Sequence, residues 1–211
     1  LVNKGGVAID MPACPSEVAV LDDESCIRDV VAADLLSQAE HGPDSRVVLV
    51  TNSEQVITDV TNALNTQLDK LPRKGIATAA LETSKMILVE DMDTAIDMLN
   101  AYAPEHLILA CKGAENLADR ITDAGSVFMG NYTPESAGDY ASGTNHTLPT
   151  NGYARAYSGV SLDSFVKKIT FQQISPEGLQ NIGSTIETMA AAEGLEAHKN
   201  AVTIRLKDLG I

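Results

Sequence analysis

The 211-residue chain has no tryptophan, few other aromatic residues and only three cysteines. Cys14, Cys26 and Cys111 are widely spaced and form no CxxC pair, which excludes a disulfide framework and a thiolate zinc site. No apolar run approaches the ~20 residues of a membrane-spanning helix, and the N-terminus lacks the pattern of a signal peptide. We therefore expect a cytoplasmic protein without a membrane partner.

Positive charge is also scarce, since 15 Lys and Arg stand against 29 Asp and Glu, for a net charge of −14. The basic residues form no run. A nucleic-acid partner would require clustered Lys and Arg, so this class of function is excluded. The acidic balance suits a small cationic substrate better.

Helical and strand-like patterns alternate up to about residue 130. Apolar residues at helical spacing run from Ser25 to the stop at Gly42-Pro43, and a second such stripe runs from Val56 to Leu71. Short apolar strands are predicted at 46–51, 85–90, 107–111 and 126–129. This alternation predicts an α/β fold with a Rossmann-like, incomplete layered structure around a mainly parallel sheet.

The glycine-rich fingerprint GxGxxG is missing from the sequence, so a conventional dinucleotide-binding turn is not predicted. Residues 165–174 are predicted as a strand or an extended linker. A helix is predicted from Ser175-Pro176-Glu177 and a last one over about 200–209, a tail too small to be stable alone. We predict a linker at 1–17, the α/β domain at 18–158 and a helical C-terminal appendage at 159–211.

A long polar stretch, YTPESAGDYASGTNHTLPT, covers residues 132–150 and has neither helical nor strand periodicity. Such a loop inside a compact domain is uncommon unless it is functional. Asp139 and His146 offer the ligand types that zinc and manganese prefer. The alternative is an Ω-loop whose polar groups bond to one another.

The four histidines all stand near acidic or amide residues. Gln38 and His41 share one face at the end of a predicted helix, where they can converge on one ion; alternatively, His41 interacts with the helix dipole. Glu105 and His106 precede a predicted strand and suit acid/base chemistry, although their spacing fits a structural role equally well. If that strand runs straight on, the pair lies at the end of the sheet opposite the usual ligand crevice.

Several long motifs occur in a fixed succession: MPACPSEV at 11–18, LLSQAEHG at 35–42, YAPEHL at 102–107, AGSVF at 124–128, TPESAGDYASGTNHTLPT at 133–150 and EGLEAHKNAV at 193–202. Together they resemble the histidinol dehydrogenase family over nearly the whole chain. The resemblance implies NAD-dependent oxidation of L-histidinol to L-histidine through L-histidinal, at the end of histidine biosynthesis.

The resemblance also implies a role for each candidate residue. Its zinc ligands would be Gln38, His41, Asp139 and His198. Its substrate contacts would come from these ligands and from Ser16, His106 and Glu193. His106 would take the hydroxyl proton, Glu105 would activate the water that hydrates the aldehyde, and His146 would be a supporting residue.

Members of this family form homodimers in which the tail reaches the other protomer, so Glu193 and His198 are expected to act across the interface. Members are also longer, and the chain matches their C-terminal half, while most NAD⁺ contacts belong to the other half. We therefore expect a fragment that binds NAD⁺ poorly and turns over little. Cys14 stands where members usually have glycine, which is expected to alter the turn that presents Ser16.

Two other functions fit the same residues. A metal-dependent hydrolase would use Glu105 to activate water without a cofactor, in agreement with the missing fingerprint. A non-catalytic zinc-binding remnant would agree with the missing half and with Cys14.

Overall fold

Five parallel strands form one sheet in the computed structural model, which describes residues 11–12 and 14–210. The strands are β1 (Glu17–Asp22), β2 (Arg46–Thr51), β3 (Lys85–Leu88), β4 (His106–Ala110) and β5 (Ser126–Met129). Their order in the sheet is β3-β2-β1-β4-β5, so the direction of progression reverses beside β1. This is the order of a doubly wound α/β fold, and the predicted parallel α/β architecture is confirmed.

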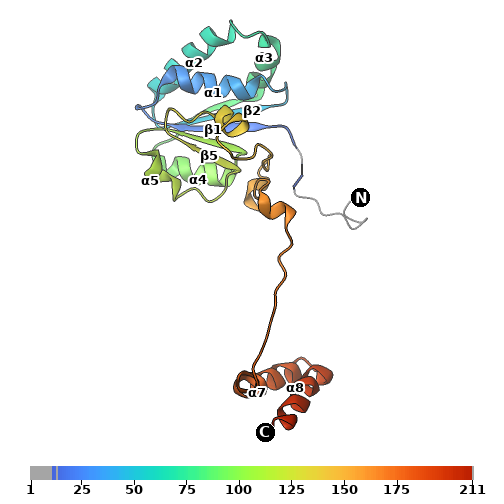
Figure 1. Ribbon diagram of the computed structural model, residues 1–211. Coiled ribbons are helices and arrows are strands. Elements are labelled where there is room, and N and C mark those ends of the chain that lie inside the picture. The colour runs from blue at the N-terminus through green and yellow to red at the C-terminus, as the bar shows by residue number, and fades with distance from the viewer. Residues whose placement is uncertain (1–10, 13, 211) are drawn as a thin grey trace. The chain divides into compact units, whose positions relative to one another are not determined.

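Helices cover both faces of this sheet (Figure 1). One face carries α1 (Arg28–Ala39), α2 (Glu54–Leu68) and α3 (Lys74–Thr83), and the other carries α4 (Met92–Tyr102) and α5 (Ala114–Ala118). The short α6 (Glu135–Tyr140) follows β5. Consecutive parallel strands need a long crossover connection, usually an α-helix, which explains the alternation in the sequence.

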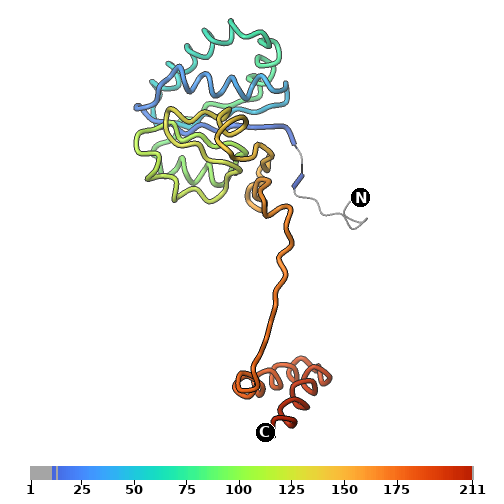
Figure 2. Tube along the Cα trace, in the orientation of Figure 1, coloured from blue at the N-terminus to red at the C-terminus, as the bar shows by residue number. Residues whose placement is uncertain are grey.

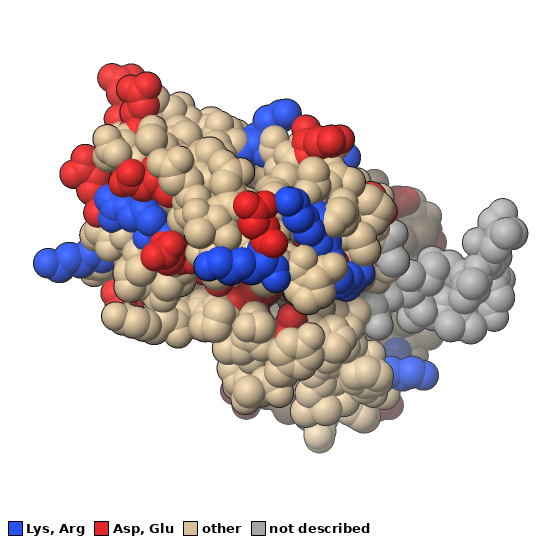
Figure 3. Space-filling view, turned by 90° about the horizontal axis from the view of Figure 1, so that it is seen from above, with Lys and Arg blue, Asp and Glu red and all other residues tan. Residues whose placement is uncertain are grey.

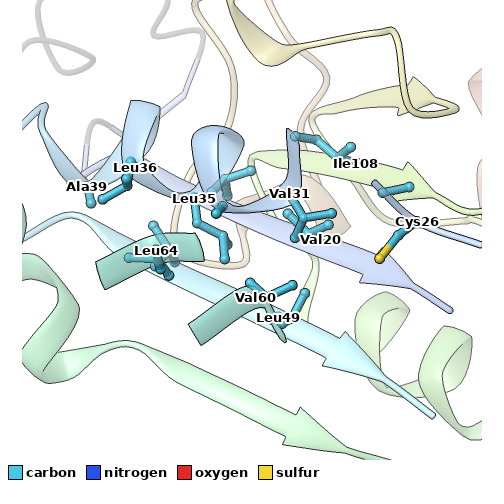
Figure 4. Packing of buried hydrophobic residues seen from close by; sticks show 14 of the residues in the cluster. Val20, Cys26, Val31, Leu35, Leu36, Ala39, Leu49, Val60, Leu64 and Ile108 are labelled. Atoms are coloured by element: carbon cyan, nitrogen blue, oxygen red, sulfur yellow. The ribbon is translucent and has the colours of Figure 1, made fainter. Parts of the chain in front are cut away.

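The core consists of two apolar layers that meet at β1, all six residues of which are buried. In the first layer, Val20 and Leu49 of the sheet pack against Val31, Leu35 and Val60 of the helices (Figure 4). Strands covered on both faces show continuous apolar runs instead of alternation. The VAVL run of β1 is such a strand.

The structure divides into two units, Leu1–Val166 and Lys167–Ile211. The second unit is a hairpin of α7 (Pro176–Ala192) and α8 (Glu196–Asp208), which Figure 2 traces. Ser175 caps α7 by accepting a hydrogen bond from the N–H of Gly178 at 3.0 Å, as the Ser-Pro-Glu start predicted. A Cβ at Gly183 would lie 2.9 Å from Leu206, so glycine permits the close packing of the two helices.

Three elements differ from the prediction. Strand β1 and helix α3 were not predicted, and α6 forms within the stretch 132–150 that was predicted to be without regular structure. Residues 166–174 contain no strand, in agreement with the linker alternative.

Among the described residues, no helix is long and apolar enough to cross a membrane. Figure 3 shows Lys and Arg side chains beside Asp and Glu side chains on the face seen from above. The pairs on this side of the sheet include Lys74 with Asp69 at 2.8 Å and Arg28 with Asp59 at 3.7 Å. Surface ion pairs of this type contribute little to stability.

Candidate active site

The predicted catalytic pair lies at the amino ends of the central strands. His106 is the first residue of β4 and Glu105 precedes it, while Glu17 is the first residue of the neighbouring β1. In doubly wound folds, ligands usually bind at the carboxyl ends of the strands. The candidate site therefore occupies the opposite end of the sheet, which was the geometry expected if the strand ran straight on from Glu105-His106.

His106 is buried, and its two ring nitrogens have different environments. Nδ1 lies 3.1 Å from the carbonyl oxygen of Glu17, which can only accept, so Nδ1 donates and carries the proton. Nε2 has no hydrogen-bond partner within the described residues and keeps its lone pair. Burial lowers the pKa of His106, which favours the neutral ring. A neutral imidazole with a free Nε2 is suited to accept a proton.

Glu105 is held beside this ring by the main chain. Its Oε2 accepts a hydrogen bond from the N–H of Glu17 at 2.9 Å and lies 3.6 Å from Nδ1 of His106. Burial, assisted by the charges of Glu17 and Asp139, raises the pKa of Glu105 to about 7. A carboxyl group that titrates near neutrality can both take up and release a proton.

The turn before β4 fixes the position of Glu105. Ala103 ends α4 in the left-handed conformation with φ +54°, a conformation that non-glycine residues adopt uncommonly. On the other side, Gly125 donates its N–H to the carbonyl of Pro104 at 2.9 Å. A Cβ at Gly125 would lie only 2.5 Å from the carbonyl oxygen of Glu105, so the approach of the two backbones requires glycine.

Glu135, the first residue of α6, adds a third carboxyl group. It is buried, its Oε1 lies 3.9 Å from Nδ1 of His106, and Oε2 has no partner within the described part of the chain. Burial raises its pKa to about 8, and the charges of Asp139, Glu105 and Asp34 act in the same direction. The crowding of acidic groups favours a cation in this region.

Three of the four predicted zinc ligands belong to the first unit. Gln38 and His41 stand at the end of α1, and Asp139 lies in α6. The charges of His41 and Asp139 both act on His106, which places them in one neighbourhood. Gln38 is fully buried, yet neither atom of its amide has a partner among the described residues, so the amide lacks the ligand or water that such a group normally has.

The two predicted tail residues belong to the second unit. Both Glu193 and His198 are exposed. Among residues 11–12 and 14–210, no three His, Cys, Asp or Glu side chains form a group able to hold a metal. Of the predicted ligands, the first unit holds Gln38, His41 and Asp139.

A pocket of about 430 Å³ opens beside Glu105. Ser16, the predicted substrate contact, lines it together with Cys14 and His146, which was predicted to be a supporting residue. Cys14 is half-buried and stands in the wall of the pocket. Cys26 and Cys111 are buried elsewhere, and burial raises the pKa of both thiols, in agreement with a structural role.

Sequence reasoning missed Glu17 and Asp34 and assigned no catalytic role to Glu135. Asp34 is buried on α1 one turn before Gln38, and burial raises its pKa to about 6. Its spacing to Gln38 and His41 was a readable signal, because positions four and seven residues apart share one face of a helix. Glu17 directly follows Ser16, but nothing in the sequence marks it.

Known proteins similar to this chain agree with the resemblance. A family model described as histidinol dehydrogenase matches residues 1–206. A histidinol dehydrogenase of Bacteroides thetaiotaomicron is 63% identical over 209 residues, which are 99% of this chain and 49% of that protein. One of Vibrio parahaemolyticus is 56% identical over 204 residues, or 97% of this chain and 47% of that protein.

A solved structure gives the same result. The crystal structure of histidinol dehydrogenase from Elizabethkingia anophelis matches with a TM-score of 0.96 and 59% identity, covering 99% of this chain and 48% of that chain. The chain thus spans about half the length of the relatives it matches.

Proposed function

Since the chain belongs to the histidinol dehydrogenase family, we propose that the protein containing it oxidises L-histidinol to L-histidine through L-histidinal, with reduction of NAD⁺. The observation that carries this proposal is the buried pair of His106, with its free Nε2, and Glu105. Oxidation of an alcohol and hydration of the resulting aldehyde each require a group that accepts a proton. The pair supplies one for each step.

His106 serves the first step. Its Nε2 accepts the hydroxyl proton of the substrate while Nδ1–H continues to donate to the Glu17 carbonyl. That hydrogen bond becomes charge-assisted as the ring gains its proton, which stabilises the imidazolium. Nε2 therefore serves as the proton acceptor, and the hydrogen bond of Nδ1 holds the ring in position.

Glu105 serves the step in which water adds to the aldehyde. The carboxylate takes one proton from the attacking water, the water oxygen bonds to the carbonyl carbon, and the carbonyl oxygen is protonated. His106 can return its proton to that oxygen. The pKa of Glu105, raised to about 7 by burial, makes it a stronger base than an ordinary carboxylate.

We propose that zinc binds to Gln38, His41, Asp139 and His198, with manganese as a cation of similar ligand preference. The unpartnered amide of Gln38 and the buried carboxyl groups around Glu135 support a cation there. Bound zinc would orient the substrate by accepting its imidazole and amino nitrogens as ligands.

The described residues do not fit NAD⁺. A dinucleotide-binding fold has its glycine-rich turn after β1, but here the end of β1 and the loop that follows read Asp22-Asp23-Glu24, and the acidic side chains of that loop repel a diphosphate. We therefore propose that the NAD⁺ contacts belong to the part of the relatives that this chain does not span, and that the isolated chain is inactive.

We propose a homodimer in which Glu193 and His198 of one protomer complete the site of the other. Both residues are exposed in the second unit. The α7–α8 hairpin also exposes Ile182, Met189 and Ile204, apolar side chains that an interface would bury.

The test is the appearance of NADH absorbance when the full-length protein is incubated with L-histidinol and NAD⁺. The variants His106→Asn and Glu105→Gln are each expected to lower kcat by roughly 100- to 10,000-fold. Wild-type turnover in both variants would refute the catalytic assignment, and release of a hydrolysis product without NAD⁺ would support the hydrolase.

Titration calorimetry of the isolated chain with NAD⁺ should show no binding.

A further inference from the structure

Glu17 contacts both catalytic side chains through its main chain. Its N–H donates to Oε2 of Glu105 at 2.9 Å, and its carbonyl oxygen accepts from Nδ1 of His106 at 3.1 Å. The first contact orients the carboxyl group, and the second selects the tautomer that leaves Nε2 free. One residue therefore sets the position of the base and of the water-activating group together.

The side chain of Glu17 is buried and fixed at both oxygens. Oε2 accepts from the hydroxyl of Tyr102 at 2.9 Å, and Oε1 accepts from the N–H of Asn151 at 2.9 Å. Tyr102 is the last residue of α4, three residues before Glu105. Asn151 follows the polar stretch 132–150 and has a positive φ of 54°. The carboxylate thus ties the start of β1 to the turn before β4 and to the end of that stretch.

The contact with Glu17 also changes the acidity of the Tyr102 hydroxyl. Burial raises the pKa of the Tyr102 hydroxyl, and the charge of Glu17 and the hydrogen bond to it act in the same direction. Hydrogen bonds to an ionised group in a buried place are roughly twice as strong as neutral ones. Such bonds hold the peptide units on both sides of Glu17 with little freedom.

We propose that Glu17 is a positioning residue of the reaction: its side chain, locked by Tyr102 and Asn151, holds the main-chain groups that orient Glu105 and His106. The proposal rests on the proposed function. Glu17 does not itself exchange a proton with the substrate, so its loss affects turnover through the two residues that it holds. Supporting groups of this kind typically change activity by about 10- to 100-fold.

The experiment compares Glu17→Ala, Glu17→Gln and Tyr102→Phe in the full-length protein, with kcat, KM, bound zinc and Tm measured for each. Glu17→Ala should lower kcat about 10- to 100-fold while KM and zinc content stay near wild type. Glu17→Gln should restore most of kcat, because its amide oxygen still accepts from Asn151 and the Tyr102 hydroxyl can accept from its NH₂. Tyr102→Phe removes one of the two links and should fall between them.

Asn100→Ala is the matched control. Asn100 also ties α4 to another segment, donating to the Arg120 carbonyl and accepting from the Thr122 N–H, both at 2.9 Å, and neither hydrogen bond involves the catalytic pair. This variant should lower Tm and leave kcat unchanged.

The outcomes separate two failures. An inactive wild-type enzyme would refute the proposed function and this inference with it. An active wild type whose Glu17→Ala variant keeps its kcat, or loses only zinc or KM, refutes the inference alone. A fall in kcat that Asn100→Ala reproduces at equal loss of Tm also refutes it. If Glu17→Ala does not fold, the fall in kcat of Tyr102→Phe decides the matter.

Discussion

At the scale of single residues, the candidate site is a place where carboxyl groups are buried close to one another. Burial is the largest cause of the raised pKa of Glu135, and the charges of Asp139, Glu105 and Asp34 raise it further. Ionised carboxylates in such a place repel one another and lose their hydration. A bound cation, or protonation of some of the carboxylates, reduces both the repulsion and the loss of hydration. Such a cluster is therefore typical of a functional site and not of a structural core.

Gly125→Ala is expected to damage the site. The new Cβ would meet the Glu105 carbonyl oxygen at 2.5 Å and Leu148 at 3.2 Å, so the backbone beneath Glu105 has to move. We expect a loss of about 1–3 kcal/mol in the free energy of unfolding and a lower kcat. Denaturant unfolding and the NADH assay measure the two effects.

Gly75→Ala is the control for this change. A Cβ at Gly75, inside α3, would have no atom within 4 Å, so alanine is expected to stabilise the helix by about 0.5–1 kcal/mol without an effect on kcat. Equal stability of the two variants would show that the contact at Gly125 has no consequence.

Asp22, at the end of β1 away from the site, is expected to make stability fall as pH rises. Burial raises its pKa from 3.8 to about 7, although the neighbouring Thr51 and Cys26 side chains act in the opposite direction. Between these two values the folded state binds the proton more tightly than the unfolded state, so stability decreases with pH and the full cost is present above pH ~7.

Asp22→Asn should therefore stabilise the protein by about 2–4 kcal/mol at pH 8 and have little effect near pH 4. Urea unfolding at the two pH values measures the difference. A gain of the same size at both pH values would show that the charge of Asp22 is not its cause.

At the scale of elements, most of the sheet could be predicted from the sequence. The strands predicted at 46–51 and 126–129 agree with β2 and β5 to the residue. β1 was missed because its short apolar run stands between Pro15-Ser16 and Asp22-Asp23, flanks typical of a linker and a turn. The six residues of α6 are too few to show a helical period.

The candidate site could be predicted where it rests on motifs and not where it rests on distant contacts. Glu105 and His106 stand in a motif that the chain shares with a family. Glu17 meets its partners Tyr102 and Asn151 from 85 and 134 residues away. Such pairs are decided by strand order and register, which local patterns do not encode.

Removal of the proposed zinc, with Gln38 in α1, His41 just after it and Asp139 in α6 as ligands, is expected to depend on pH. Glu105 and Glu135, with pKa values raised to about 7 and about 8, hold protons below these values and then attract a cation less. Chelation of zinc from the full-length protein should therefore lower Tm more at pH 8 than at pH 6. Calorimetric scans with and without chelator measure this, and an equal drop at both values would contradict it.

At the scale of the whole molecule, the predicted ligands are divided between two units. Residues 166–174, which contain no helix or strand, connect the unit of Gln38, His41 and Asp139 with the unit of His198. His198 can complete the site of its own chain or the site of a partner protomer. Only in the second arrangement can two different inactive variants restore activity to each other when they are mixed.

His106→Asn and His198→Ala, each inactive alone, are therefore expected to regain activity when their full-length forms are mixed and refolded. A mixed dimer has one site with both changes and one site with neither. Random pairing makes half of the dimers mixed, so about a quarter of wild-type activity should return. A mixture that stays inactive would show that His198 acts within its own chain.

The candidate site lies at the amino ends of the strands, so an insertion at their carboxyl ends stands apart from it. β2 has six residues, which at about 3.3 Å each separate its ends by about 20 Å. A fluorescent domain inserted after the exposed Asn52, at the far end of β2, would stand well away from Glu105 and His106. Such a fusion would allow the protein to be followed in a living cell.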